Sequence, residues 1–355
     1  MDLNNPETFK EIDASDMFAF ITDLPDQFEQ AWARRTDLDL PAGLGDVNRI
    51  VVCGMGGSAI SGALVSALVE DTLPIPIISN RSYDLPAYAT DDSTLVVLMS
   101  HSGTTEETLS CARQAVERGT KTLAVTTGGD LAPLITDNGG GVVPFAYDSP
   151  PRAALGWLYG SLLAGLHAIG ILPDLSDSVA ESVELMREGR RMLSPEHDDD
   201  TNKAKRMAGQ LVDRTPIIWG GGLLEPVANR WKTQINENAK SAAYFEAMPE
   251  LNHNAVVGTQ FPENVVIGKI APVHLRSRSD HPRVAIRHKA TQQLLRQYGI
   301  VADSVMAQGD SRLAQQMTLV QFGDYVSYYL AMAYGIDPTP IEAINSLKQQ
   351  LAEAG

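Results

Sequence analysis

Cysteine, aromatic residues and positive charge are all scarce in this chain. Only two of the 355 residues are cysteine, and Cys53 and Cys111 lack the spacing of metal ligands. We interpret both as buried thiols, which fits a reducing cytosol. Lysine and arginine number 28 against 44 acidic residues, for a net charge of −16. Because proteins bind nucleic acids through basic patches that neutralise phosphates, this balance argues against a nucleic-acid partner.

The sequence also lacks a convincing membrane segment. Residues 1–11 are polar and acidic, unlike a signal peptide. Residues 153–172 are nearly free of charge and approach membrane-spanning length, but they contain His167, Ser161 and several glycines. We interpret this stretch as a core helix. The sequence therefore predicts a cytoplasmic protein with no membrane partner.

No metal site is expected. His274, His281 and His288 are spaced by seven residues, but their surroundings are charged and no carboxylate completes a ligand set. We therefore interpret the spacing as coincidence. No hydrolase elbow around a nucleophilic serine is present either.

Strand-like and helix-like segments alternate through the first half of the chain. Strands are predicted at residues 49–53, 75–79, 94–100, 121–126 and 141–145, with helices starting at Ser58 and Thr104. This alternation is typical of a doubly wound parallel sheet.

The second half repeats the order of strand, glycine turn and helix. A short strand at 216–219 runs into Gly220-Gly221-Gly222 and a helix from Leu223, which we interpret as a diverged internal repeat. Further strands are predicted at 264–270 and 300–306, and further helices at 289–298, 311–334 and from Pro340. Ligands of such sheets bind at the carboxyl ends of the strands.

The chain is long enough to divide into two units. We expect an N-terminal helical segment, a first α/β domain, a helical linker with a polar loop, a second α/β domain and a C-terminal helix. Their predicted boundaries are 1–44, 45–175, 176–204, 205–335 and 336–355.

A run of hydroxyl side chains lies at a predicted turn between a strand and a helix. Ser100-His101-Ser102-Gly103-Thr104-Thr105 follows a buried strand and precedes a helix. Free backbone N–H groups and the positive end of the helix dipole favour an anion there, and a phosphate monoester fits. The alternative is a simple cluster of helix-capping residues. His101 is expected to point away from such a site.

A second loop, Gly54-Met55-Gly56-Gly57-Ser58-Ala59, also joins a strand to a helix. It matches the dinucleotide pattern G-x-G-x-x-G/A, but the next strand ends in Asn80-Arg81 instead of the acid that would hold an NAD ribose. Because the Arg81 side chain could bind the 2′-phosphate of NADP, an NADP-linked dehydrogenase remains an alternative. A glycine turn that serves only close packing is another.

Together with other motifs, the two loops resemble the sugar isomerase (SIS) domain family, and more closely the bifunctional phosphoglucose/phosphomannose isomerases of archaea and bacteria. The resembling segments are Leu24-Pro25, Gly54–Gly62, Ser100–Thr108, Pro151-Arg152, Asn236–Asn238, Glu250–Asn254 and Ile341–Lys348. The resemblance implies an α/β fold with two doubly wound parallel-sheet SIS-like subdomains facing across a cleft. It also implies an aldose–ketose isomerase of glucose and mannose 6-phosphates that needs no cofactor. A SIS-type sugar-phosphate sensor without catalysis is the alternative within the family.

The resemblance assigns roles to particular residues. Glu237 would be the base that moves a proton between C2 and C1, and Arg152 would stabilise the enediolate. His253, from the neighbouring subunit of a homodimer with shared active sites, would open the sugar ring with help from Lys348. The phosphate group would be held by Gly57, Ser58, Ser100, Ser102 and Thr105.

Each of these residues also has an ordinary structural interpretation. Glu237 could be a solvated helix residue and His253 a surface histidine, while Arg152 could form an interdomain salt bridge and Lys348 lie on the surface of an amphipathic helix. From its position, Glu250 is expected to orient the His253 loop. The role of Thr339 stays open.

Overall fold

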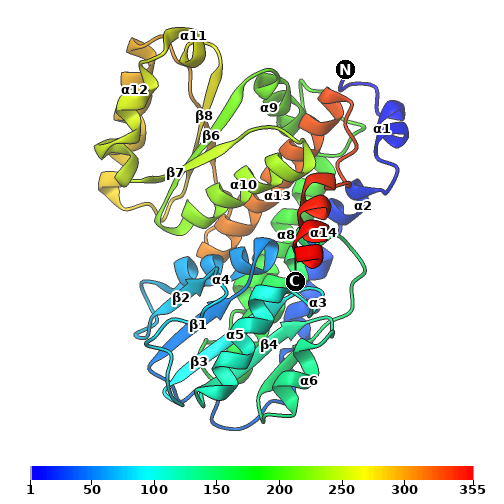
Figure 1. The fold of residues 1–355 in the computed structure, drawn as a ribbon. Helices are drawn as coiled ribbons and strands as arrows, with labels where there is room; N and C mark the ends of the chain where they lie inside the picture. Colours follow the sequence, from blue (N-terminus) through cyan, green and yellow to red (C-terminus); the bar gives the residue numbers. More distant parts are fainter. Residues whose placement is uncertain (1, 355) are drawn as a thin grey trace.

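Two α/β units lie one above the other in the computed structural model, which describes residues 2–354 (Figure 1). The first unit holds a five-stranded parallel sheet in the order β2-β1-β3-β4-β5. Its strands are β1 (Arg49–Cys53), β2 (Ile77–Asn80), β3 (Thr94–Ser100), β4 (Lys121–Thr126) and β5 (Gly141–Pro144).

The second unit holds a four-stranded parallel sheet in the order β7-β6-β8-β9. Its strands are β6 (Thr215–Gly221), β7 (Tyr244–Met248), β8 (Ile270–Arg276) and β9 (Asp303–Met306). Since the order repeats that of β2-β1-β3-β4, the two units wind in the same way. The predicted α/β class with two parallel sheets is confirmed.

Helices cover both sheets and fill the space between the units. Those of the first half are α1 (Glu7–Ile12), α2 (Met17–Thr22), α3 (Leu24–Ala33), α4 (Gly56–Val69), α5 (Glu106–Glu117), α6 (Leu131–Thr136) and α7 (Leu155–Ala168). Those of the second half are α8 (Ser176–Met192), α9 (Lys203–Leu211), α10 (Glu225–Asn238), α11 (Glu263–Val266), α12 (Pro282–Gln297), α13 (Arg312–Tyr334) and α14 (Glu342–Ala354). The 3-10 turns are η1 (Arg34–Thr36), η2 (Pro151–Ala153), η3 (Gly222–Leu224), η4 (Glu250–His253) and η5 (Ala255–Thr259).

Two apolar helices form the centre of the core. The predicted helix in the uncharged stretch 153–172 is α7, and most of its side chains are buried against α3 and α4. The long helix α13 packs against α8, α9 and α10, and α4 contacts α10 across the two units. Among the described residues no helix combines the length and apolar character needed to cross a membrane.

Some elements of the second unit differ from the prediction. The strand predicted at 264–270 is wrong: the short helix α11 follows Pro262, Gly268 adopts φ +72°, and the strand β8 then begins at Ile270. Proline favours a helix start, and a positive φ favours glycine at a break. The edge strand β7 and the helix α6 were not predicted. β7 carries Glu246 within YFEAM and is mostly half-exposed, so it lacks the apolar run of a central strand.

Two of the three evenly spaced histidines pair inside the second unit, a contact that the sequence did not predict. The Nδ1 atoms of His274 on β8 and His288 on α12 lie 2.8 Å apart, and both side chains are fully buried. His281 instead caps α12. Burial lowers the pKa of His274 to about 3 and that of His288 to about 4, so both rings are neutral at pH 7. No cluster of three metal-binding side chains is found in residues 2–354.

Stability is therefore expected to fall in mild acid. In the unfolded chain each histidine takes up a proton near pH 6.5, whereas in the folded chain it does so only far below that value. Each histidine should remove about 1.4 kcal/mol of unfolding free energy per pH unit as the pH falls below 6.5. We expect the unfolding free energy, measured by urea unfolding between pH 7 and 5, to change less steeply with pH in His288→Gln than in the unmodified protein. Substituting the exposed His197 with Gln is the matched control, and equal slopes for all three proteins would contradict the prediction.

Candidate functional site

The two predicted anion-binding loops lie side by side. β1 pairs in parallel with β3, with Cys53 opposite Leu98, so both strands end at the same edge of the sheet. Gly54 allows this close approach, because a Cβ atom there would lie 2.9 Å from the Met99 carbonyl oxygen. Gly57 likewise packs against η2, where a Cβ atom would lie 3.0 Å from the oxygen of Pro151. The loops and Arg152 are thus neighbours.

The hydroxyl groups of the second loop bond to one another. Ser100 Oγ lies 2.8 Å from Thr105 Oγ1 and accepts a hydrogen bond from the N–H of Gly103. Ser102 Oγ accepts from both the N–H and the hydroxyl of Thr104. Thr105 is the N-cap residue of α5, yet its side chain makes no capping hydrogen bond. The loop therefore gathers neutral donors at a helix N-terminus, beyond what capping requires.

His101 points away from this loop, as expected. Its ring packs edge-on against Phe145, with the centroids 5.7 Å apart. Burial lowers the pKa of His101.

Arg152 is a buried charge at the junction of the two units. It is 3% exposed. Its Nε donates to Asn238 Oδ1 at 2.8 Å, and Nη2 donates to the carbonyl oxygens of Pro338 at 2.7 Å and Thr339 at 2.9 Å. Burial lowers the pKa of Arg152, and the charge of Glu237 opposes that shift. The structure thus holds a guanidinium in a fixed orientation, as needed to stabilise a delocalised oxyanion.

Glu237 lies beside Arg152. Its Oε2 atom is 3.7 Å from Arg152 Nη1, and its side chain is 27% exposed against 4% for the arginine. Glu237 is in the last turn of α10, where the sequence placed it. The flanking asparagines bond elsewhere: Asn236 donates to the carbonyl of Ser241, and Asn238 bonds to Arg152 and Ser327.

The sequence analysis did not predict a group of buried polar residues that contact Arg152 and Asn238. Arg230 forms an ion pair with Asp324 at 2.7 Å and also donates to the backbone oxygen of Arg152. Asn238 Nδ2 donates to Ser327, whose hydroxyl donates to the Asp324 carbonyl. Burial raises the pKa of Asp324, and Arg230 opposes the shift. Because these contacts join distant parts of the chain, no local motif indicates them.

Thr339 presents a hydroxyl without a partner. Its Oγ1 atom is buried and forms no hydrogen bond among the described residues, while its carbonyl accepts from Arg152. A buried polar atom normally has a partner, so the role of this hydroxyl stays open.

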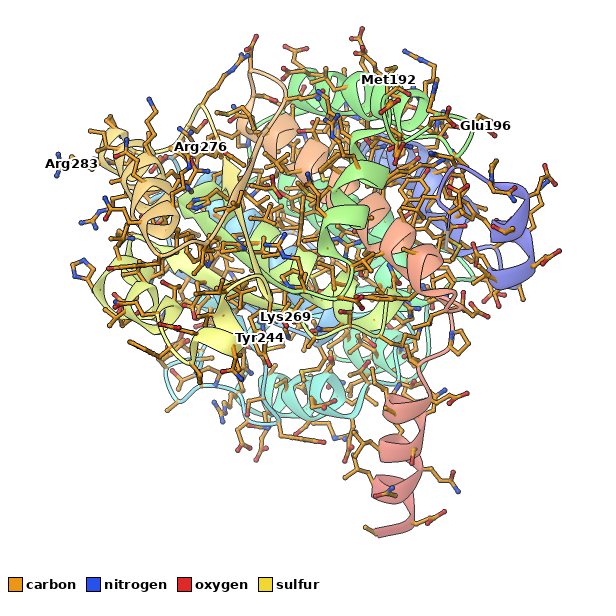
Figure 2. The ribbon with its side chains drawn as sticks, turned by 90° about the horizontal axis from the view of Figure 1, so that it is seen from above. Met192, Glu196, Tyr244, Lys269, Arg276 and Arg283 are labelled. Atoms are coloured by element: carbon orange, nitrogen blue, oxygen red, sulfur yellow. The ribbon has the colours of Figure 1, made fainter. Side chains whose placement is uncertain are left out.

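His253 and Lys348 are not brought to this pair within one chain. His253 ends η4 as an exposed side chain, in a loop where Asn254 donates to Glu250 as expected. Lys348 is on α14, which has no buried side chain among its described residues. Figure 2 shows this helix extending away from the body of the molecule.

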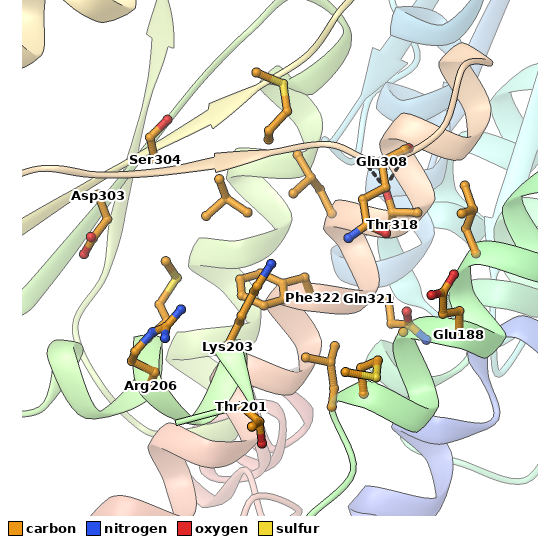
Figure 3. A pocket seen from close by; sticks show the side chains of 18 of the residues that line it. Glu188, Thr201, Lys203, Arg206, Asp303, Ser304, Gln308, Thr318, Gln321 and Phe322 are labelled. Carbon is orange, nitrogen blue, oxygen red and sulfur yellow. Dashed lines mark hydrogen bonds between the residues drawn. The ribbon is translucent and has the colours of Figure 1, made fainter. Parts of the chain in front are cut away.

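A cavity of about 540 Å³ lies elsewhere, beside the edge strand β9 (Figure 3). Residues of α8, α9, β9 and α13 line it, including Lys203, Arg206, Asp303 and Phe322. It contains none of the site residues predicted from the sequence.

Comparisons with known proteins identify the family of the chain. The sequence model of the SIS domain matches residues 43–134, and that of the bacterial phospho-glucose isomerase C-terminal SIS domain matches residues 200–351. The bifunctional phosphoglucose/phosphomannose isomerase of Caldicellulosiruptor bescii is 41% identical, over 95% of this chain and 99% of its own. The chain belongs to this family of isomerases.

Further similarities support the assignment to the family. Its member from Aquifex aeolicus is 33% identical, over 88% of this chain and 93% of its own. A glucose-6-phosphate isomerase like protein from Thermus thermophilus superposes over 96% of this chain and 98% of its own, with a TM-score of 0.64 and 21% identity. This structural similarity shows the shared fold.

Anion binding by the hydroxyl loop can be tested directly. We expect Ser102→Ala combined with Thr105→Ala to weaken the binding of inorganic phosphate and of fructose 6-phosphate. Each lost hydrogen bond to a charged group is worth about 1.5–3 kcal/mol, or roughly tenfold or more in affinity. Titration calorimetry gives the dissociation constants, with Ser110→Ala on the following helix as control. Equal affinity in the double variant would place the phosphate group elsewhere.

Proposed function

We propose that this protein interconverts glucose 6-phosphate and mannose 6-phosphate with fructose 6-phosphate through a cis-enediol. The contact between Arg152 and Glu237, next to the hydroxyl loop, carries the proposal. The contact puts a carboxylate beside a fixed positive charge, and Gly57 of the neighbouring loop packs against the backbone of Pro151 and Arg152. A sensor that only binds sugar phosphates has no need of that pair, and family membership favours an isomerase over an NADP-linked dehydrogenase.

In the proposed reaction Glu237 takes the proton from C2 of the open-chain aldose and returns it to C1. As C2 loses its proton, the carbonyl at C1 becomes an enediolate oxygen, whose charge Arg152 stabilises. Proton transfer to that oxygen and from the hydroxyl at C2 then gives the ketose. Because the stereocentre at C2 disappears in the intermediate, one base can serve both epimers. His253 and Lys348 would open the ring, and Gly57, Ser58, Ser100, Ser102 and Thr105 would hold the phosphate.

The proposal also covers domain organisation and location. We infer the division at residues 44, 175, 204 and 335 that the sequence predicts, supported by one parallel sheet within each α/β segment. We further infer a cytoplasmic location, which two buried free thiols support. The proposed chemistry uses side chains alone, without a cofactor or metal.

The base can be tested by an amide substitution. Glu237→Gln keeps nearly the same shape but cannot accept the proton, so kcat should fall at least about 10²-fold with little change in substrate affinity. Loss of the C2 hydrogen to solvent, followed by NMR in heavy water, measures the step itself. Glu246→Gln, on the edge strand β7, is the control. Near-normal exchange in the Glu237 variant would assign the base to another residue.

We infer that the working unit is a homodimer in which His253 reaches the partner's site. Two exposed apolar surfaces support this inference. The segment after His253 exposes the side chains of Val257, Phe261, Val265 and Ile267. Along α14, Ile344, Leu347 and Leu351 are exposed at helical spacing, on the helix that carries Lys348. Apolar patches of this kind mark interaction surfaces.

Complementation tests the shared site. Glu237→Gln and His253→Ala are each expected to be inactive, but in a mixed dimer one site carries both defects and the other carries none. Because half of the dimers in an equal mixture are mixed, about a quarter of the normal activity should return after subunit exchange. Mass spectrometry of the mixture verifies that mixed dimers form. If they form without activity, both residues act within one chain.

A further inference from the structure

Lys240 binds the backbone on both sides of the candidate site. It follows the C-cap of α10 in the left-handed conformation, with φ 51°, which is uncommon for a lysine. Its ammonium group donates to the carbonyl oxygens of Glu237 at 2.9 Å and Asn238 at 3.4 Å. It also donates to those of Asp337 at 2.9 Å and Pro338 at 2.8 Å. One side chain thus ties the end of α10 to the segment that leads into α14.

These carbonyl groups belong to the residues that hold the catalytic pair. Glu237 is the proposed base, and Asn238 accepts from Arg152 Nε. The Pro338 oxygen accepts from both Lys240 Nζ and Arg152 Nη2. Any movement of Lys240 would therefore reach the base and the guanidinium together.

We propose that Lys240 is a positioning residue, whose ammonium group fixes the spacing between the Glu237 carboxylate and the Arg152 guanidinium. This inference rests on the proposed roles of those two residues. Lys240 touches only backbone oxygens, so it acts through its neighbours instead of on the substrate. A misplacement of about 1 Å at a reacting centre can lower a rate about 10²-fold. A side chain that fixes this spacing therefore matters for catalysis.

The hydrogen bonds from Lys240 to these carbonyl oxygens depend on the charge of its ammonium group. An ammonium group has three donors and no acceptor, which suits a nest of carbonyl oxygens. After deprotonation two donors remain, and a lone pair faces the same oxygens. Partial removal from water and the nearby Arg152 charge lower the pKa of Lys240 to about 8, while Asp337, Glu237 and Glu342 of α14 oppose the shift. As the pH rises through this value, Lys240 should hold the spacing between the Glu237 carboxylate and the Arg152 guanidinium less firmly.

The experiment compares Lys240→Met with Lys240→Arg, and uses Lys232→Met, on the helix α10 that precedes Lys240, as the matched control. For Lys240→Met we expect kcat to fall at least about tenfold, with KM for fructose 6-phosphate changed less than about threefold, since the phosphate loop is untouched. The unmodified enzyme should lose kcat above about pH 8. In Lys240→Arg, kcat at pH 7 should largely return and the alkaline loss should move up by at least about one pH unit, because guanidinium stays charged.

Two results would overturn the inference: a normal kcat in Lys240→Met, or an alkaline loss in Lys240→Arg that stays near pH 8. Thermal melting shows whether Lys240→Met folds; if it does not, the pH profile of Lys240→Arg decides. Failure of the proposed function is distinguishable, since the unmodified protein would then not isomerise fructose 6-phosphate. An inactive Glu237→Gln with a normal Lys240→Met would overturn the positioning role alone.

Discussion

The Arg152 guanidinium is the point on which both the fold and the site depend. A buried charge is costly unless hydrogen bonds replace the lost water. Here the replacements come from distant segments: the Asn238 amide on α10 and the Pro338 and Thr339 carbonyls before α14. Glu237 supplies a negative charge 3.7 Å away, and Asp337 is a second acidic group nearby. The cation therefore draws the two units together while keeping part of its charge available to an anion.

A second buried cation supports the first. Arg230 pairs with Asp324 and donates to the Arg152 backbone, so α13 helps to position η2. Removing one partner of a buried pair typically costs about 3–5 kcal/mol, because the other charge is left unpaired. This group of buried polar residues is thus part of the interior on which the folded state rests, and this limits how freely the geometry of Arg152 can vary.

The sequence predicts contacts between residues that are close along the chain better than contacts between residues that are far apart in it. The hydroxyl loop could be predicted because a buried strand, Ser100–Thr105 and a helix start are contiguous. The family resemblance supplied Arg152 and Glu237, but nothing local reveals that Arg152 bonds to Asn238, 86 residues away. The pairing of His274 with His288 escaped prediction for the same reason. Their spacing is visible, but only β8 packing against α12 brings the rings together.

The strand predicted at 264–270 failed for a more local reason. Apolar residues at 265–267 suit a strand, but Pro262 starts a helical turn and Gly268 breaks the chain before β8. Val265 and Ile267 are consequently exposed on the surface instead of buried in the sheet. Hydrophobicity alone does not distinguish a core strand from an apolar surface patch.

On the proposed function, the anion site of this acidic chain is built from neutral groups and confined charges. With a net charge of −16, the chain as a whole repels anions, so a phosphate group must be attracted locally. Ser100, Ser102 and Thr105 donate without charge, at the N-terminus of α5. Arg152 is buried and partly compensated by Glu237, so its charge acts over short range. The proposed base Glu237 and the proposed charge stabiliser Arg152 lie together inside one chain, while His253 and Lys348 are exposed on segments with apolar surfaces. On the proposed function, folding of one chain brings together the residues for proton transfer. Ring opening also needs His253, which the second subunit of the homodimer supplies.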